Sequence, residues 1–160
     1  MTAPLHLAMT GETDLTLTRE FAAPARTLWR ALTEPALLMR WQWAQDWPML
    51  HCDVDLRPGG SFRWVWQTAP DRQVGVSGQF LTVKAPTSLI HTEVFDEDWT
   101  GGITTVTQTL TEPSPGKTLL SMVIRYSTPA ARASAAATPM VEGMEEGYEK
   151  LDALFLSGLV

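Results

Sequence analysis

The last part of the chain carries a single apolar stripe with helical spacing. Its members follow one another at intervals of four, four, three and four residues: Met140, Met144, Tyr148, Leu151 and Phe155. This spacing places the five side chains on one face of an α-helix, while charged residues fill the other faces. A helix with one apolar face is stable when another element covers that face. The stripe therefore requires a matching apolar surface from the preceding residues.

Two prolines mark where the helices of this tail begin. Thr128-Pro129 and Thr138-Pro139 are both typical helix starts. Because proline has no backbone N–H, Pro139 predicts a break or kink between two helical segments. The alanine-rich residues 130–137 belong to the first segment, and the apolar stripe belongs to the second.

The rest of the chain predicts mainly β-strands with one buried face. In Asp14–Phe21, Leu15, Leu17 and Phe21 alternate with polar residues. Similar segments occur between residues 50 and 126, separated by turns rich in glycine and proline. The strands expected there are Cys52–Arg57, Ser61–Gln67, Val74–Lys84, Ser88–Phe95, Gly102–Glu112 and Lys117–Tyr126.

Two short helices follow the first strand. Pro24 suits the first turn of a helix that ends near Thr33, and Pro35 starts a second helix that carries Trp41 inward. The layout predicts an α+β fold in which one long helix covers an antiparallel sheet of about six or seven strands. We expect residues 1–160 to form one such domain, with residues 1–12 as a flexible extension.

The charge balance and the cysteine count limit the partners and the compartment. The chain has 12 Lys and Arg residues against 18 Asp and Glu residues, a formal net charge of −6. This balance argues against nucleic acid and against an anionic membrane surface as partners. The single cysteine, Cys52, excludes an internal disulfide, and the N-terminus lacks the pattern of a signal peptide. We therefore expect a cytoplasmic protein.

Metal and cofactor sites are not expected. His6, His51 and His91 share no metal-ligand spacing, and the paired glycines of the hairpins are not followed by the Lys-Ser/Thr of a phosphate-binding loop. A homodimer is compatible with these features but has no residue-level support.

Four motifs follow one another over most of the chain. They are Arg19–Pro24 with Leu28–Thr33, Pro35, Leu38 and Trp41; the turn Asp55–Gly60; Gly78 with Ala85-Pro86, Leu89 and Thr92; and Gly143–Tyr148 with Leu151 and Leu154. In this order they resemble the SRPBCC superfamily, which includes START and birch-pollen-allergen proteins. Within it, they resemble the branch related to the heat-shock-protein-ninety ATPase activator. The resemblance runs from about Leu15 to Leu156.

This resemblance implies a helix-grip fold. In such a fold a curved antiparallel sheet wraps around the C-terminal helix, and an apolar cavity lies between them. The resemblance does not imply one chemistry, because members include lipid carriers, hormone receptors and polyketide aromatase/cyclases. The chain departs from the branch after Trp41, where Gln42–Pro48 replaces a stretch that is commonly rich in proline and glycine. This segment would border the mouth of the cavity.

Aromatic and methionine side chains are the candidate walls of such a cavity. Ligand pockets are mostly apolar and aromatic, and methionine adapts to ligands of different shape. The alternative is that the same side chains form an ordinary core. The candidates are Trp41, Trp43, Trp64, Trp66, Met122, Met140, Met144 and Tyr148.

His91 and Glu93 are the sharpest polar pair in the sequence. Two residues apart on one strand, they lie on the same face, which is also the face of Leu89. A carboxylate beside a histidine fixes the tautomer and orientation of the ring, as a general base requires. In the alternative orientation, both side chains face solvent and Ile90, Thr92 and Val94 are buried.

The sequence therefore supports three hypotheses for function. The first is binding of a small apolar or aromatic molecule, with His91 and Glu93 orienting it. The second is a cyclase-like enzyme in which the same pair transfers protons. The third is a cofactor of a chaperone ATPase, by analogy with the branch.

Overall fold

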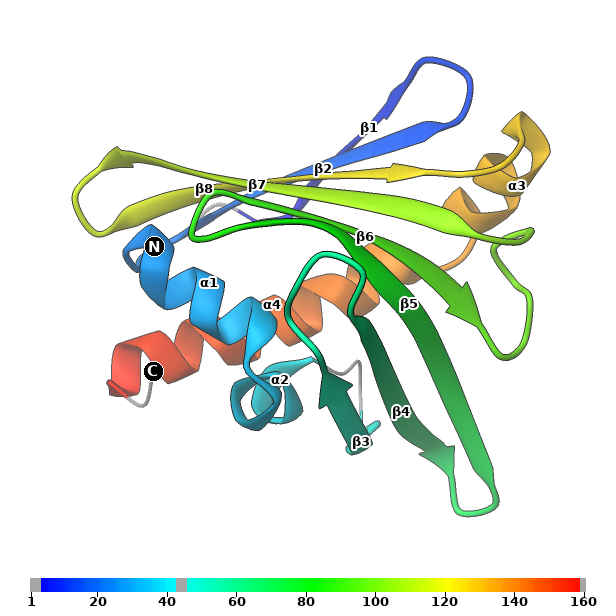
Figure 1. The fold of residues 1–160 in the computed structure, drawn as a ribbon, viewed down its shortest axis with the longest axis horizontal. Coiled ribbons are helices and arrows are strands. Elements are labelled where there is room, and N and C mark those ends of the chain that lie inside the picture. The colour runs from blue at the N-terminus through cyan, green and yellow to red at the C-terminus, as the bar shows by residue number, and fades with distance from the viewer. Residues whose placement is uncertain (1–3, 43–45, 159–160) are drawn as a thin grey trace.

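An antiparallel sheet of eight strands curves around a long C-terminal helix in the computed structural model, which describes residues 4–42 and 46–158 (Figure 1). The strands are β1 (His6–Thr10), β2 (Asp14–Phe21), β3 (Met49–Val54), β4 (Ser61–Ala69), β5 (Arg72–Lys84), β6 (Ser88–Phe95), β7 (Thr104–Ser114) and β8 (Lys117–Arg125). The helices are α1 (Ala25–Thr33), α2 (Pro35–Trp41), α3 (Pro129–Ala136) and α4 (Met140–Ser157). The expected α+β helix-grip arrangement is therefore confirmed.

The order of the strands explains how the sheet encloses α4. They lie in the order β1-β2-β8-β7-β6-β5-β4-β3, and all neighbouring pairs are antiparallel. The strands β3 to β8 follow one another as consecutive neighbours. Helices α1 and α2 connect β2 to β3, which lie toward opposite ends of the sheet (Figure 1). The sheet is curved, and α1, α2 and α4 all lie on its concave side (Figure 1).

The alternation seen in the sequence matches the buried face of the sheet. On β2, Leu15, Leu17 and Phe21 are at most 1% exposed, and on β8, Leu120 and Ile124 are also buried. Paired residues of an antiparallel sheet point to the same side, so one register brings these positions together. Leu15 pairs with Ile124, for example.

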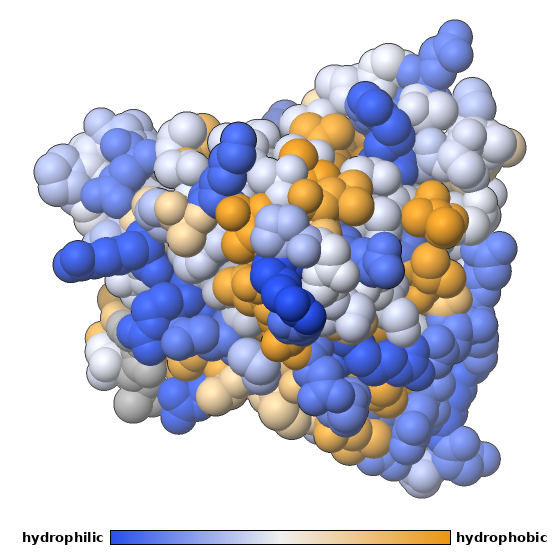
Figure 2. Space-filling model, in the orientation of Figure 1, coloured by the Kyte–Doolittle hydropathy of each residue, from blue (hydrophilic) through white to orange (hydrophobic). Residues whose placement is uncertain are grey.

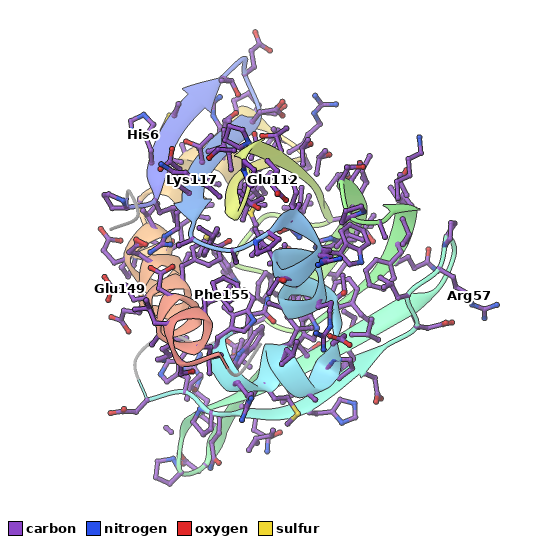
Figure 3. All side chains as sticks on the ribbon, turned by 90° about the vertical axis from the view of Figure 1, so that its left-hand side faces the viewer. His6, Arg57, Glu112, Lys117, Glu149 and Phe155 are labelled. Atoms are coloured by element: carbon purple, nitrogen blue, oxygen red, sulfur yellow. The ribbon has the colours of Figure 1, made fainter. Side chains whose placement is uncertain are left out.

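The two C-terminal helices are separated at Pro139, as the sequence predicts. Helix α3 begins at a capped turn, in which the hydroxyl of Thr128 accepts a hydrogen bond from the N–H of Ala131 at 3.0 Å. Helix α4 then runs for 18 residues and buries Tyr148 and Leu151 against the sheet. Figure 3 shows Phe155 pointing from α4 towards α1, whereas Glu149 lies on the outer side of α4.

The strand count is larger than the predicted six or seven. The additional strand is β1, which lies within the segment expected to be a flexible extension and pairs with β2 from His6 to Thr10. Its side chains are mostly exposed, so this edge strand lacks the apolar alternation that identified the others.

The strand expected over Cys52–Arg57 lies over Met49–Val54 instead, because the following residues form a tight turn. The N–H of Arg57 bonds to the carbonyl of Asp55 at 2.9 Å, and the N–H of Gly60 bonds to the carbonyl of Arg57 at 2.8 Å. A Cβ at Gly60 would overlap the carbonyl oxygen of Asp55, so glycine is required there. Asp55 and Arg57 also form an ion pair at 2.9 Å.

Candidate functional site

A cavity of about 580 Å³ lies between the sheet and the N-terminal half of α4. Its walls come from α1, α2 and α4, from β4 to β8, and from the residues around the α3–α4 junction. Most of the lining is apolar. In Figure 2, apolar residues reach the surface in patches across the middle of the molecule, surrounded by hydrophilic ones. The volume falls in the range of small-molecule sites, roughly 300–1,000 Å³.

The sequence of α4 explains why the space is open at one end of the helix and filled at the other. Gly143 and Gly147 line the cavity. They are four residues apart on one face of the helix and carry no side chain that could fill the space. Towards the C-terminus, Leu151 and Phe155 continue the apolar stripe and pack into the main hydrophobic core, Leu151 fully buried there. The stripe therefore combines an open segment with a packed one.

Aromatic rings form much of the wall. Trp41 stacks on Tyr148 with ring centroids 5.5 Å apart, and Trp64 contacts Trp66 at 6.2 Å. The indole N–H of Trp41 donates to the carbonyl of Ala31 at 2.8 Å, which joins the ring to α1. The indole N–H of Trp66 donates to the carbonyl of Gln42 at 2.5 Å. These hydrogen bonds fix two of the rings in place.

His91 and Glu93 both lie on the concave face and line the cavity. The Nε2 atom of His91 lies 3.0 Å from Oε2 of Glu93. The His91 side chain is 3% exposed and the Glu93 side chain 19%. The imidazole is enclosed by aromatic rings, with Phe62 at 5.2 Å and Trp64 at 6.2 Å between centroids. Of the two orientations expected from the sequence, the inward one is observed.

Four polar atoms in the cavity lining are buried and have no hydrogen-bond partner among the residues that the structure describes. They are Nδ1 of His91, Nε1 of Trp64, Oε1 of Gln108 and Oε1 of Gln42. Buried polar groups are nearly always hydrogen-bonded, and leaving one unsatisfied costs about 1–3 kcal/mol. These atoms are therefore candidates for contact with a polar group of a bound molecule.

Both tyrosines of the chain line the cavity and stay uncharged at neutral pH. Burial, with a smaller contribution from the Glu93 carboxylate, raises the pKa of Tyr126 to about 12. Burial also raises the pKa of Tyr148, against an opposing effect of Arg19. The phenol groups thus contribute neutral surface to the cavity.

The outer part of the cavity is bordered by an ion pair and by the loop between β6 and β7. Arg72 on β5 donates from Nη2 to Oε2 of Glu97 at 2.8 Å. In the same loop, Trp99 packs edge-on against Phe95 with centroids 4.9 Å apart, and both rings line the cavity. The ion pair therefore joins two segments beside the cavity that lie far apart in the sequence.

The structure brings nine of the ten sequence-predicted site residues into the cavity lining: Trp41, Trp64, Trp66, His91, Glu93, Met122, Met140, Met144 and Tyr148. The tenth, Trp43, lies outside the described residues. Their placement meets the geometric requirement of the predicted site, and their role in binding stays a prediction.

Several lining residues were not singled out from the sequence, among them Gln42, Gln108 and Trp99. Gln108 had a detectable signal. It follows Val106 and precedes Leu110 on the buried face of β7, where a polar residue interrupts an apolar alternation. Gln42 and Trp99 lie outside strands and helices, where periodicity says nothing about which way a side chain points.

The described part of the chain offers neither a metal site nor a membrane-spanning helix. No group of three or more His, Cys, Asp or Glu side chains there could hold a metal ion. None of the helices described is both long enough and apolar enough to cross a membrane.

Comparison with known proteins identifies close structural relatives. The family model described as "Activator of Hsp90 ATPase homolog 1-like protein" matches residues 22–155. A crystal structure from Rhodobacter sphaeroides has 40% sequence identity and a TM-score of 0.91, and the match covers 97% of this chain and 99% of that one. A crystal structure from Nitrosomonas europaea has 30% identity and a TM-score of 0.82, covering 95% of this chain and 100% of that one.

A third solved structure, with lower sequence identity, shows only that the fold is shared. The AHSA1 protein of Silicibacter pomeroyi has 23% identity and a TM-score of 0.72, covering 91% of this chain and 99% of that one. No curated protein matches the sequence significantly. The comparisons therefore establish ancestry and fold.

Proposed function

Because the chain belongs to the family of Activator of Hsp90 ATPase homolog 1-like proteins, with a relative of 40% identity over nearly its whole length, we propose that it uses the helix-grip fold to bind a small apolar or aromatic molecule. The site is the cavity between the sheet and α4. Trp41, Trp64 and Trp66 form its walls, and His91 with Glu93 orients the ligand.

The observation that carries this proposal is the cavity itself. Its volume of about 580 Å³ suits a small molecule, and its lining combines aromatic rings with a few placed polar groups. Methionines 122, 140 and 144 also line it, and their flexible side chains can adjust to the shape of a ligand. An ordinary core would fill this space with side chains.

The other two functions expected from the sequence are not favoured by these findings. Proton transfer by His91 and Glu93 requires a substrate whose reacting group lies within hydrogen-bond reach of the pair. The match to an ATPase-activator family supports shared ancestry, and a fold does not fix a function. Cytoplasmic location and a possible homodimer also stay predictions.

Native mass spectrometry of the purified protein, followed by extraction, tests for a bound molecule. In parallel, the fluorescence of Nile red should rise on binding to the cavity. Gly143→Leu places a side chain at the cavity lining and should weaken dye binding about tenfold or more. Ala153→Leu adds the same side chain at an exposed position of α4 and should leave binding unchanged.

The outcomes separate binding from a closed core. If neither a molecule is recovered nor dye binding responds to Gly143→Leu, the proposal is wrong. Mixing the protein with an Hsp90 ATPase and measuring hydrolysis tests the chaperone hypothesis directly.

A further inference from the structure

Three of the four unpaired polar atoms in the cavity lining belong to side chains that lie close together on the sheet. His91 pairs with Val106 across β6 and β7, and Gln108 follows two residues later on the same face of β7. His91 and Gln108 are therefore diagonal neighbours, roughly 7–8 Å apart between Cα atoms in such an arrangement. Trp64 completes the group, because its ring centroid lies 6.2 Å from that of His91. All three side chains are at least nine-tenths buried.

The hydrogen bond to Glu93 determines what His91 offers to a ligand. A carboxylate only accepts, so Nε2 of His91 carries the proton and donates to Oε2 of Glu93. In the neutral ring, Nδ1 is then a bare acceptor, and it has no partner among the described residues. Gln108 adds a second unpaired acceptor at Oε1, and Trp64 adds an unpaired N–H donor.

A hydroxyl group fits this set better than a polar group that only accepts hydrogen bonds. It can donate to Nδ1 of His91 or Oε1 of Gln108 and accept from the indole N–H of Trp64. An ether or ketone only accepts, so it would leave both acceptors buried and unsatisfied.

The charges around the cavity argue against an anionic ligand. Four carboxylates and one guanidinium line it among the residues described: Glu93, Glu97, Glu142, Glu146 and Arg72. Arg72 is already paired with Glu97 at 2.8 Å. A carboxylate in the cavity would lose its hydration and meet like charges, and both effects oppose binding.

We propose that the cavity selects an uncharged aromatic molecule that carries a hydroxyl group, and that His91, Gln108 and Trp64 recognise this hydroxyl. The inference rests on the proposed function, since it names the class of ligand for the same cavity. It assigns the aromatic walls to the ring system of the ligand and the polar group on β4, β6 and β7 to its hydroxyl.

A matched series of probes tests the selection by isothermal titration calorimetry: 2-naphthol, 2-methoxynaphthalene, 2-naphthoate and 2-naphthylmethylammonium. We expect 2-naphthol to bind about tenfold more tightly than the methoxy compound, since one hydrogen bond to buried unpaired groups distinguishes them. The naphthoate should bind more weakly still.

Variants then locate the recognition. Gln108→Leu replaces the amide with an apolar side chain of similar size and removes an acceptor that only 2-naphthol can use, so it should reduce the preference for 2-naphthol over 2-methoxynaphthalene to about twofold. Trp64→Phe removes a donor from which the oxygen of either probe accepts, so it should weaken the binding of both probes and leave their ratio nearly unchanged. The control is Gln79→Leu, at an exposed position of β5, which should leave the preference unchanged. Thermal unfolding of each variant verifies that it is folded.

The outcomes separate this inference from the proposed function. Equal binding of the hydroxy and methoxy probes, or tightest binding of the naphthoate or the ammonium compound, overturns the inference and leaves cavity binding intact. If none of the four probes binds, cavity binding of small aromatic molecules is refuted and the inference falls with it.

Discussion

Arg19 on β2 forms a bidentate ion pair with Asp152 on α4 through two parallel hydrogen bonds. Nη1 donates to Oδ1 at 3.1 Å and Nη2 to Oδ2 at 2.8 Å. The same guanidinium donates from Nε to Glu145 at 2.5 Å and lies 4.7 Å from the centroid of the Phe21 ring. The Arg19 side chain is 3% exposed. One buried cation therefore binds two turns of α4 to the sheet, one beside the cavity at Glu145 and one in the packed half of the helix at Asp152.

Replacing Arg19 should destabilise the protein strongly. Arg19→Met keeps an apolar stem but leaves two carboxylates without their buried cation, which costs about 3 kcal/mol. In a chain of this size that corresponds to roughly 6–12 °C in Tm. Urea unfolding and calorimetry measure both values. Arg30→Ala, which removes an exposed pair with Glu34, should cost less than about 1 kcal/mol; equal losses in the two variants would contradict the assignment.

Gly78 on β5 should not tolerate a methyl group. A Cβ there would overlap the carbonyl oxygen of Thr92 and approach the Phe62 ring to 2.5 Å at Cε1. Gly78→Ala should therefore lower the free energy of unfolding by about 2 kcal/mol, measured by urea unfolding. The neighbouring Gln79→Ala, at an exposed site, serves as the control and should change stability by less than about 0.5 kcal/mol.

The tyrosines should resist ionisation in the folded protein. The chain has two tyrosines, and both have a pKa raised by burial, that of Tyr126 to about 12. Absorbance at 295 nm should stay flat between about pH 9 and 11 in buffer, and rise around pH 10 in urea. A rise centred near pH 10 in the folded protein would show that the phenols are hydrated.

The same shifts predict how stability depends on alkaline pH. A phenol whose pKa is higher in the folded state ionises first in the unfolded chain. The stabilising contribution is fully present below the unfolded pKa of about 10 and is lost as the pH rises through the folded value. The urea midpoint should therefore fall above about pH 10, and Tyr126→Phe should reduce the fall.

Cys52 should react slowly with thiol reagents. Burial, with a smaller contribution from Asp53, raises its pKa to about 11. Only the thiolate is the nucleophile, so at pH 8 the folded protein should react with Ellman's reagent at least about tenfold more slowly than the protein in urea. Equal rates in buffer and in urea would show that the thiol is neither buried nor perturbed.

The sequence predicted most of the fold because its apolar residues repeat with clear periods. Alternation identified β2 and the strands from β4 to β8, and the helical stripe with Pro139 separated α3 from α4. Strand β1 was not predicted because an exposed edge strand buries almost no side chains. Its sequence therefore lacks the alternation of apolar and polar residues. The end of β3 was misplaced because the bonds of the Asp55–Gly60 turn are set by backbone conformation and glycine contacts.

The walls of the cavity were easier to predict than its polar group. The aromatic and methionine residues follow the same sequence periods as the core residues. Their position on the buried face of the strands and of the helix could therefore be predicted. The neighbourhood of His91, Gln108 and Trp64 depends on the register across the four strands β4 to β7, including a shift in register between β5 and β6. A single sequence does not specify that register. His91 with Glu93 could therefore be proposed as a polar pair and Trp64 as a wall residue, but the grouping of His91, Trp64 and Gln108 could not.

The pairing of β2 with β8 also has a consequence for biosynthesis. Asp14 pairs with Arg125 and Phe21 with Thr118. When β2 leaves the ribosome, its partner strand is about a hundred residues from being made, which takes roughly 5–20 s at ordinary rates of translation. Until then the apolar face of β2 has no sheet to join. Completion of the sheet is therefore a late event, dominated by contacts between distant segments, and we expect the chain to fold more slowly than a helical protein of the same length.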